Sequence, residues 1–171
     1  MNLPNKLTLV RIALIPVCLL LWAIGWHIPS AAVFALAAIT DFLDGYLARK
    51  NGIVTTFGKF ADPVADKMLV LTAMIFLCAD GLLPHWAVAI VAARELMVDG
   101  LRMVASQKGV VIAVGWLGKI KTNLQLFCIL SAMVLGKIWV TDVLMYAMAA
   151  MTLASGVQYF MNSWQMIMED K

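Results

Sequence analysis

Six long apolar stretches, separated by short polar turns, dominate this chain and restrict what it can fold into. Hydrophobic residues make up 63% of its 171 residues and charged residues only 13%, and its mean hydropathy is +0.91. Soluble domains are about half apolar and about a quarter charged, whereas a membrane-spanning helix needs about 20 mainly apolar residues. The sequence therefore predicts an all-α membrane protein with six transmembrane helices, at about Leu7–Trp26, Ala31–Leu47, Phe57–Ala79, Trp86–Val104, Trp116–Leu135 and Val140–Trp164.

The segment before the first stretch, Asn2–Lys6, predicts a short N-terminal interfacial lead-in, with Pro4 near the start of a helix. Lys6 and Arg11 next to an apolar core also resemble a signal peptide. No clear cleavage site ends the stretch, however, and further spans follow it. We therefore expect a retained first helix.

The placement of the basic residues predicts the orientation of the helices. If all six span, both termini, the 49–59 loop and the 104–121 region lie on one side, which collects every Lys and Arg except Lys137. The turns on the other side, around His27 and His85, contain no Lys or Arg, so the positive-inside rule makes the basic side cytoplasmic. Tryptophans near both interfaces agree with this topology: Trp22, Trp26, Trp86 and Trp139 at the outer one, and Trp116 and Trp164 at the inner one.

Four of the ten acidic residues lie in a single stretch, from Asp41 to Lys67. If both halves of the stretch are helical, Asp41 and Asp44 lie one turn apart on one face, and Asp62 and Asp66 do so on the next helix. An ionised Asp at the centre of a membrane helix costs about 2.5–3.5 kcal/mol on insertion scales. Neighbouring carboxylates also raise one another's pKa values, so the cluster needs compensation.

Ion pairs, shared protons or divalent metal ions could each compensate the four carboxylates. Arg49, Lys59 and Lys67 are near enough in sequence to form a salt-bridge network at the inner interface. Carboxylates alone suit hard cations such as Mg²⁺ or Mn²⁺, whereas Zn²⁺ prefers His or Cys, which the stretch lacks. Pairs of such metals are a common device for phosphoryl transfer. Gly45 and Gly58 favour the metal interpretation, because they open space beside the carboxylates that a salt-bridge network does not need.

The spacing within this stretch resembles the signature of a known enzyme family. The signature reads Asp41-x2-Asp44-Gly45-x2-Ala48-Arg49-x8-Gly58-x3-Asp62-x3-Asp66. It is similar at every position to that of the CDP-alcohol phosphotransferases, integral membrane enzymes of phospholipid synthesis with six transmembrane helices. Other segments resemble the branch that makes phosphatidylglycerol phosphate, so the resemblance covers essentially the whole chain: Asn2–Arg11, Gly58–Lys67, Ala93–Glu95 and Gly118–Thr122.

The resemblance implies that the aspartates bind two divalent cations, Mg²⁺ or Mn²⁺, which hold the diphosphate of CDP-diacylglycerol. It also implies that Asp66 is the general base, taking a proton from the acceptor hydroxyl as that hydroxyl attacks phosphorus and CMP leaves. The absence of Cys and His from the stretch favours direct displacement over a covalent intermediate. The implied metal ligands are Asp41, Asp44, Asp62 and Asp66, and the implied CDP-diacylglycerol-binding residues are Asp44, Gly45, Ala48, Arg49 and Gly58.

Basic residues at the predicted cytoplasmic helix ends indicate an anionic acceptor, and the resemblance identifies it as sn-glycerol 3-phosphate. Arg94 lies about half-way into its span, where neighbouring Glu95 or Asp99 could simply be its ion-pair partner. Other cations could instead contact lipid headgroups, as we expect for Lys50 and Lys108. The predicted acceptor-phosphate residues are Lys59, Arg94, Arg102, Lys119, Lys121, Thr8 and Arg11.

Together these features predict one integral membrane catalytic domain over residues 1–171, acting on CDP-diacylglycerol and glycerol 3-phosphate among membrane lipids, with no nucleic-acid partner. The family suggests a homodimer in the bacterial inner membrane with its active site on the cytoplasmic side. The aspartates do not separate this acceptor from a second phospholipid, inositol phosphate or serine. A cation transporter is an alternative from another class, although transporter sites tend to lie near the midplane between repeats, and no repeat is visible here.

Overall fold

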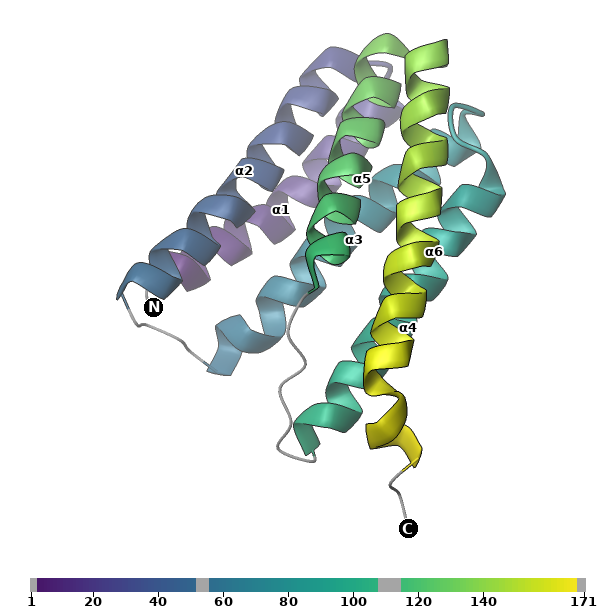
Figure 1. Cartoon of the computed structure of the whole chain (residues 1–171). Coiled ribbons are helices and arrows are strands. Elements are labelled where there is room, and N and C mark those ends of the chain that lie inside the picture. Colours follow the sequence, from purple (N-terminus) through teal and green to yellow (C-terminus); the bar gives the residue numbers. More distant parts are fainter. Residues whose placement is uncertain (1–2, 52–55, 108–114, 169–171) are drawn as a thin grey trace. The chain divides into compact units, whose positions relative to one another are not determined.

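In the part of the chain that it describes, a computed structural model contains six α-helices and no β-strand (Figure 1). That part covers residues 3–51, 56–107 and 115–168, and side chains are described for residues 7–40, 61–106 and 115–163. The all-α class predicted from the sequence is confirmed. The helices are α1 Leu3–Ala23, α2 His27–Asn51, α3 Thr56–Ala79, α4 His85–Gln107, α5 Trp116–Leu135 and α6 Trp139–Met168.

Two helices begin about one turn earlier than the sequence predicted. α1 starts at Leu3 rather than after a separate lead-in, because Pro4 falls in the first turn, where its missing N–H removes no helical hydrogen bond. α2 starts at His27 rather than Ala31. The turn before it is tighter than expected, since Gly25 adopts a positive φ of 84° that reverses the chain within a few residues.

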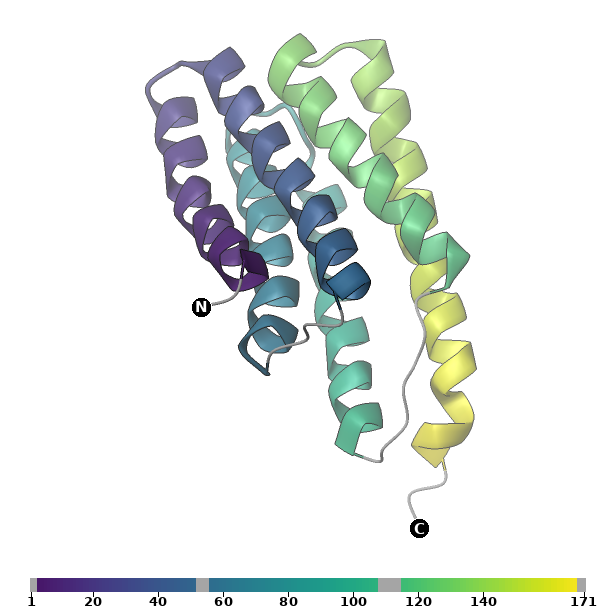
Figure 2. The ribbon, with the colours of Figure 1, turned by 90° about the vertical axis from the view of Figure 1, so that its left-hand side faces the viewer.

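α1, α2 and α3 belong to a first compact unit, formed by Met1–Leu82 and Ile129–Gly136. α1 packs against both other helices, and Figure 2 shows it side by side with α2. Where these two helices meet, Ser30 Oγ donates a hydrogen bond of 2.8 Å to the Cys18 carbonyl oxygen. The large apolar side chains that this unit buries completely or almost completely include Phe34, Met74, Leu77 and Ile129.

α4 and α6 pack against each other in a second unit, formed by Leu83–Cys128 and Lys137–Lys171. Trp86 of α4 stacks on Tyr146 of α6, with 5.8 Å between ring centroids. The buried face of α6 is unusually polar for so apolar a helix, and its outer face is apolar. Buried polar side chains recur on it at helical spacing: Thr152, Ser155, Tyr159 and Ser163.

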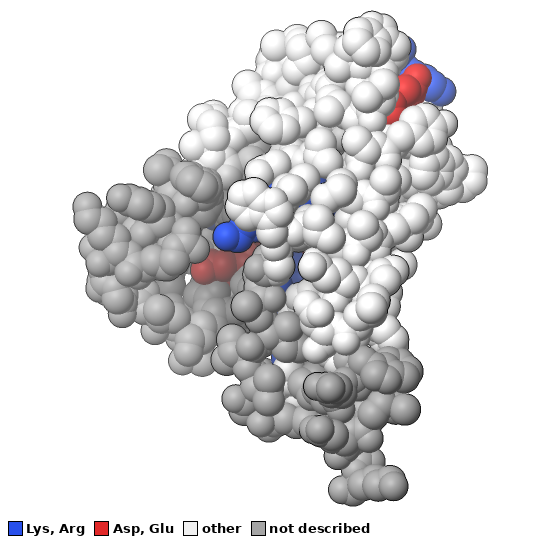
Figure 3. Space-filling model, viewed as in Figure 1, with Lys and Arg blue, Asp and Glu red and all other residues white. Residues whose placement is uncertain are grey.

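One helix among the described residues is long and apolar enough by itself to cross a membrane, the Trp139–Ser163 segment of α6. Leu7–Ala23 and His27–Thr40 are apolar but shorter. Large apolar side chains nevertheless remain exposed, such as Leu96 at 70% and Met161 at 69%, and uncharged residues dominate the described part of the face drawn in Figure 3. Exposed apolar surface of this kind suits contact with lipid.

Candidate active site

The signature aspartates lie on two helices of the first unit that contact each other. Asp41 and Asp44 are on α2, and Asp62 and Asp66 are on α3. The prediction that both halves of the stretch are helical is therefore confirmed for these positions. Asp62 and Asp66 are four residues apart, so both leave the same face of α3, and both side chains are half-buried.

Part of the predicted site lies outside the residues whose side chains the structure describes. Within the described side chains, no group of three or more His, Cys, Asp and Glu could hold a metal ion. The described side chains include only Asp62 and Asp66 of the four predicted ligands, so the two-metal hypothesis stays a prediction. The predicted residues outside the description are Asp41, Asp44, Gly45, Ala48, Arg49, Gly58 and Lys59.

α1 supplies two further predicted residues to the first unit. Thr8 Oγ1 donates a hydrogen bond of 2.5 Å to Asp62 Oδ1. Thr8 and Arg11 are both completely buried and lie about one turn apart on α1. The sequence predicted Thr8 as a ligand of the acceptor phosphate, whereas in the structure the Thr8 hydroxyl donates its proton to the carboxylate of Asp62.

The donor chemistry of this region fits a divalent cation. An ionised carboxylate offers about four lone-pair sites, so the bond from Thr8 leaves Asp62 with capacity for a metal. Oxygen ligands of this kind are those that Mg²⁺ and Mn²⁺ prefer. The hydrogen bond also fixes the orientation of one carboxylate, as partners of metal ligands commonly do.

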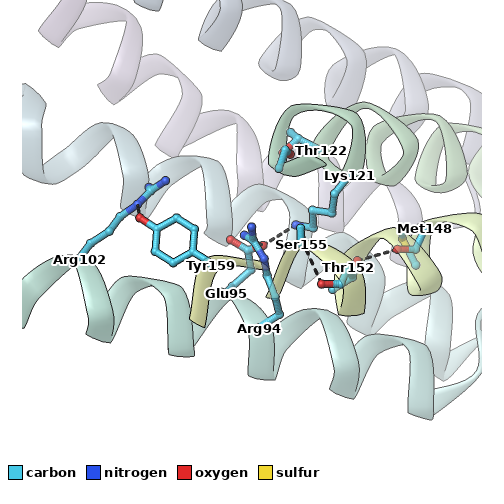
Figure 4. A network of polar contacts seen from close by, with 10 residues as sticks. Arg94, Glu95, Arg102, Lys121, Thr122, Met148, Thr152, Ser155 and Tyr159 are labelled. Atoms are coloured by element: carbon cyan, nitrogen blue, oxygen red, sulfur yellow. Dashed lines mark hydrogen bonds and ion pairs between the residues drawn. The ribbon is translucent and has the colours of Figure 1, made fainter. Parts of the chain in front are cut away.

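In the second unit, two predicted phosphate-binding cations share one carboxylate oxygen. Arg94 Nη1 donates to Glu95 Oε1 at 3.1 Å, and Lys121 Nζ donates to the same oxygen (Figure 4). Glu95 is 9% and Lys121 only 3% exposed. Gly156 of α6 gives Arg94 room, because a Cβ at this position would lie 3.4 Å from Arg94 Cγ. Glu95, one of the two ion-pair partners expected for Arg94, thus does pair with it. A role of Arg94 in acceptor binding stays a prediction.

Arg102 forms a separate polar contact in the same unit. It lies eight residues after Arg94 on α4, about 12 Å of helix rise. Its Nε donates a hydrogen bond of 2.9 Å to the Tyr159 hydroxyl of α6, and its guanidinium carbon lies 5.5 Å from the centre of that ring. The sequence did not identify Tyr159. Its helical spacing from Ser155 and Ser163 is the one signal that could have found it.

The two lysines of the Gly118–Thr122 segment take different environments. Lys119 is exposed, whereas Lys121 is buried against Glu95. Residues two apart on an α-helix leave it in nearly opposite directions, so the two side chains start from different sides of α5. The sequence grouped these lysines, and the structure separates them.

A cavity of about 520 Å³ in the first unit lies away from the aspartates. It is lined in part by Trp22, His27 and Asp80, and Trp22 Nε1 donates a hydrogen bond of 2.6 Å to Asp80 Oδ2. Asp80 comes eighteen residues after Asp62, about 27 Å along α3 and its end, so this cavity is not part of the aspartate site. Trp22 is 5% exposed, so its side chain packs inside the first unit, and its predicted place near the outer interface stays a prediction.

An apolar, all-helical chain that carries carboxylate pairs on two contacting helices and buries the basic side chains of Arg11 and Lys121 has the features of a membrane enzyme acting on phosphate compounds. The chain belongs to the CDP-alcohol phosphatidyltransferase family, whose model matches residues 1–157. The resemblance inferred from the aspartate spacing is therefore confirmed at the level of the family.

Curated relatives are similar to almost the entire chain. A Bacillus subtilis protein named CDP-diacylglycerol–glycerol-3-phosphate 3-phosphatidyltransferase is 40% identical, with 96% of each chain covered. A Rickettsia typhi protein of the same name is 41% identical over 93% of this chain and 95% of its own. A Mycobacterium tuberculosis protein named probable phosphatidylglycerophosphate synthase is 43% identical over 92% of this chain and 79% of its own.

Proposed function

We propose that the protein transfers the phosphatidyl group of CDP-diacylglycerol to sn-glycerol 3-phosphate, giving phosphatidylglycerol phosphate and CMP. The observation that carries this proposal is the similarity over almost the whole chain to proteins whose names state that reaction. The signature aspartates on α2 and α3 support the same donor chemistry.

The location and organisation of the protein form part of the same proposal. All six helices span the inner membrane of a bacterium, with both termini and the active site on the cytoplasmic side, and residues 1–171 act as one catalytic domain. The charge distribution and the exposed apolar side chains support this topology. A homodimer is the assembly that the family suggests.

Two divalent cations, Mg²⁺ or Mn²⁺, would be held by Asp41, Asp44, Asp62 and Asp66. When bound, they would neutralise the diphosphate of CDP-diacylglycerol and make its phosphorus more electrophilic. Thr8 holds the carboxylate of Asp62 in place through its 2.5 Å hydrogen bond. Gly45, Ala48 and Gly58 have small side chains that permit a nucleotide to approach the helices, and Arg49 adds positive charge beside it.

Asp66 accepts the proton of the acceptor hydroxyl in this mechanism. The hydroxyl oxygen forms a bond to the phosphorus next to the lipid, the bond from that phosphorus to the CMP oxygen breaks, and CMP leaves as an anion. Residues 41–67 contain no Cys or His, which favours one direct displacement over a covalent enzyme intermediate. The residues proposed to hold the acceptor phosphate are Lys59, Arg94, Arg102, Lys119, Lys121, Thr8 and Arg11.

The proposed reaction can be tested by measuring CMP release from CDP-diacylglycerol by the purified protein in detergent micelles. We expect release with glycerol 3-phosphate and none without an acceptor. Serine, inositol phosphate and phosphatidylglycerol are the matched acceptors to compare, each with the same metal and lipid. Strict dependence on any of these three would overturn the proposed acceptor, and no CMP release with any acceptor would overturn the reaction class.

Thr8→Val is expected to weaken Mn²⁺ binding by about 10- to 100-fold, as loss of a hydrogen bond to a metal ligand commonly does. Val has the shape of Thr but no hydroxyl, so Asp62 loses its donor. The measurement is a Mn²⁺ titration followed by electron paramagnetic resonance on the purified protein. Thr72→Val is the control, because the Thr72 hydroxyl bonds only the Met68 and Leu69 carbonyls of its own helix in the described structure. Thr8→Ser should restore binding, and wild-type affinity in Thr8→Val would contradict the assignment.

A further inference from the structure

The second unit contains two cationic centres with different electrostatic properties. At the first, Glu95 accepts hydrogen bonds from Arg94 and Lys121. At the second, Arg102 contacts the Tyr159 ring and hydroxyl. Figure 4 shows these groups together, with the Arg102 guanidinium directed at the Tyr159 hydroxyl. The first centre contains a carboxylate and the second a neutral phenol, so the two centres are expected to attract an anionic substrate to different extents.

The charge at the first centre is reduced by its own carboxylate. Arg94, Lys121 and Glu95 together carry one net positive charge. The Glu95 carboxylate already accepts hydrogen bonds from both cations. Within the described part of the chain, Arg102 forms no ion pair with a carboxylate, and its partner is a neutral phenol. Among the described residues, no carboxylate therefore balances the positive charge of Arg102.

The geometry of Tyr159 orients Arg102 without neutralising it. The Tyr159 oxygen accepts the hydrogen bond of Nε, and the guanidinium carbon lies 5.5 Å from the centre of the ring, so Tyr159 restrains the orientation of the group. The two terminal nitrogens then present the paired donors that suit bidentate binding of a phosphate. Tyr159 is 7% exposed, whereas Arg102 is half-buried, so the ring is held by packing while the cation remains accessible.

We propose that Tyr159 is a positioning residue that holds Arg102 for the phosphate group of the acceptor, and that this pair selects a phosphorylated alcohol over an uncharged one. The inference rests on the proposed function, because it specifies how Arg102, one of the cations proposed to hold the acceptor phosphate, is oriented toward glycerol 3-phosphate. It adds a residue outside the region that the family model matches, which ends at residue 157.

Tyr159→Phe tests the role, because it keeps the buried ring and removes only the hydroxyl. We expect the KM for glycerol 3-phosphate to rise about three- to tenfold, the effect of losing one ordinary intramolecular hydrogen bond. The KM for CDP-diacylglycerol and the thermal unfolding midpoint should stay unchanged, which a merely structural role would not produce. Tyr146→Phe is the matched control on the same helix, since Tyr146 is exposed and stacks on Trp86.

Arg102→Lys provides an independent second variant, since it keeps the charge but removes the Nε donor. If Tyr159 acts through Arg102, combining Tyr159→Phe with Arg102→Lys should raise the acceptor KM no further than Arg102→Lys alone. Additive effects, or a wild-type acceptor KM in Tyr159→Phe, would overturn the positioning role while wild-type activity upholds the proposed function. A wild-type protein that releases no CMP with glycerol 3-phosphate would instead overturn the proposed function itself.

Discussion

Asp66→Asn is expected to lower kcat for CMP release about a thousandfold or more, because general-base catalysis contributes about 10²- to 10⁴-fold. Asn has nearly the same shape as Asp, but it cannot accept the acceptor proton and carries no charge. Asp66 lies one turn after Asp62 on α3 and is half-buried, so the substitution changes the chemistry of that face more than its packing. Binding of CDP-diacylglycerol should be retained in part.

The measurement is single-turnover CMP release at saturating glycerol 3-phosphate, combined with binding of CDP-diacylglycerol to the same preparation. Asp80→Asn is the control, since it makes the same replacement in the same unit, at the far end of α3. Its side chain accepts from Trp22, a role that the Asn carbonyl can fill, so kcat should stay close to that of the wild type. An Asp66→Asn variant that keeps a tenth of wild-type kcat would exclude Asp66 as the base.

Helices and aspartate positions could be predicted from the sequence because both depend on local spacing. Apolar runs separated by short turns located six helices, and the interval from Asp62 to Asp66 sufficed to place both on one face. Helix starts were less accurate, since Pro4 was read as part of a lead-in although proline fits the first turn of a helix. The turn at Gly25 depends on the positive φ of that residue. Glycine can adopt a positive φ, but its presence in a sequence does not show that it does.

Contacts between distant segments could not be predicted in the same way. The Trp22 side chain is buried and donates a hydrogen bond to Asp80, a residue fifty-eight positions away, and no local pattern indicated this contact. Tyr159 lies fifty-seven positions after Arg102 and carries no local motif. Helix packing brings such residues together, and a single sequence does not state which faces pack.

Glu95→Gln is expected to destabilise the folded protein by about 3–5 kcal/mol, the usual effect of breaking a buried ion pair by removing one partner. Gln has the size of Glu and keeps an oxygen acceptor, so the change is almost purely one of charge. In the wild type, one Glu95 oxygen holds both Arg94 and Lys121. Without the negative charge, two nearly buried cations would repel each other in a poorly solvated site. The measurement is the free energy of unfolding of the detergent-solubilised protein.

A compensating variant separates loss of charge balance from loss of packing. Lys121→Met replaces the 3% exposed lysine with an apolar side chain of similar length, which removes one of the two cations. Because apolar residues can replace a buried ion pair with little cost, the Glu95→Gln and Lys121→Met double variant should be more stable than Glu95→Gln alone. It should still show a raised KM for glycerol 3-phosphate, since a cation of the proposed acceptor site is absent. A double variant less stable than either single one would show that Glu95 acts through packing and not by balancing the two cations.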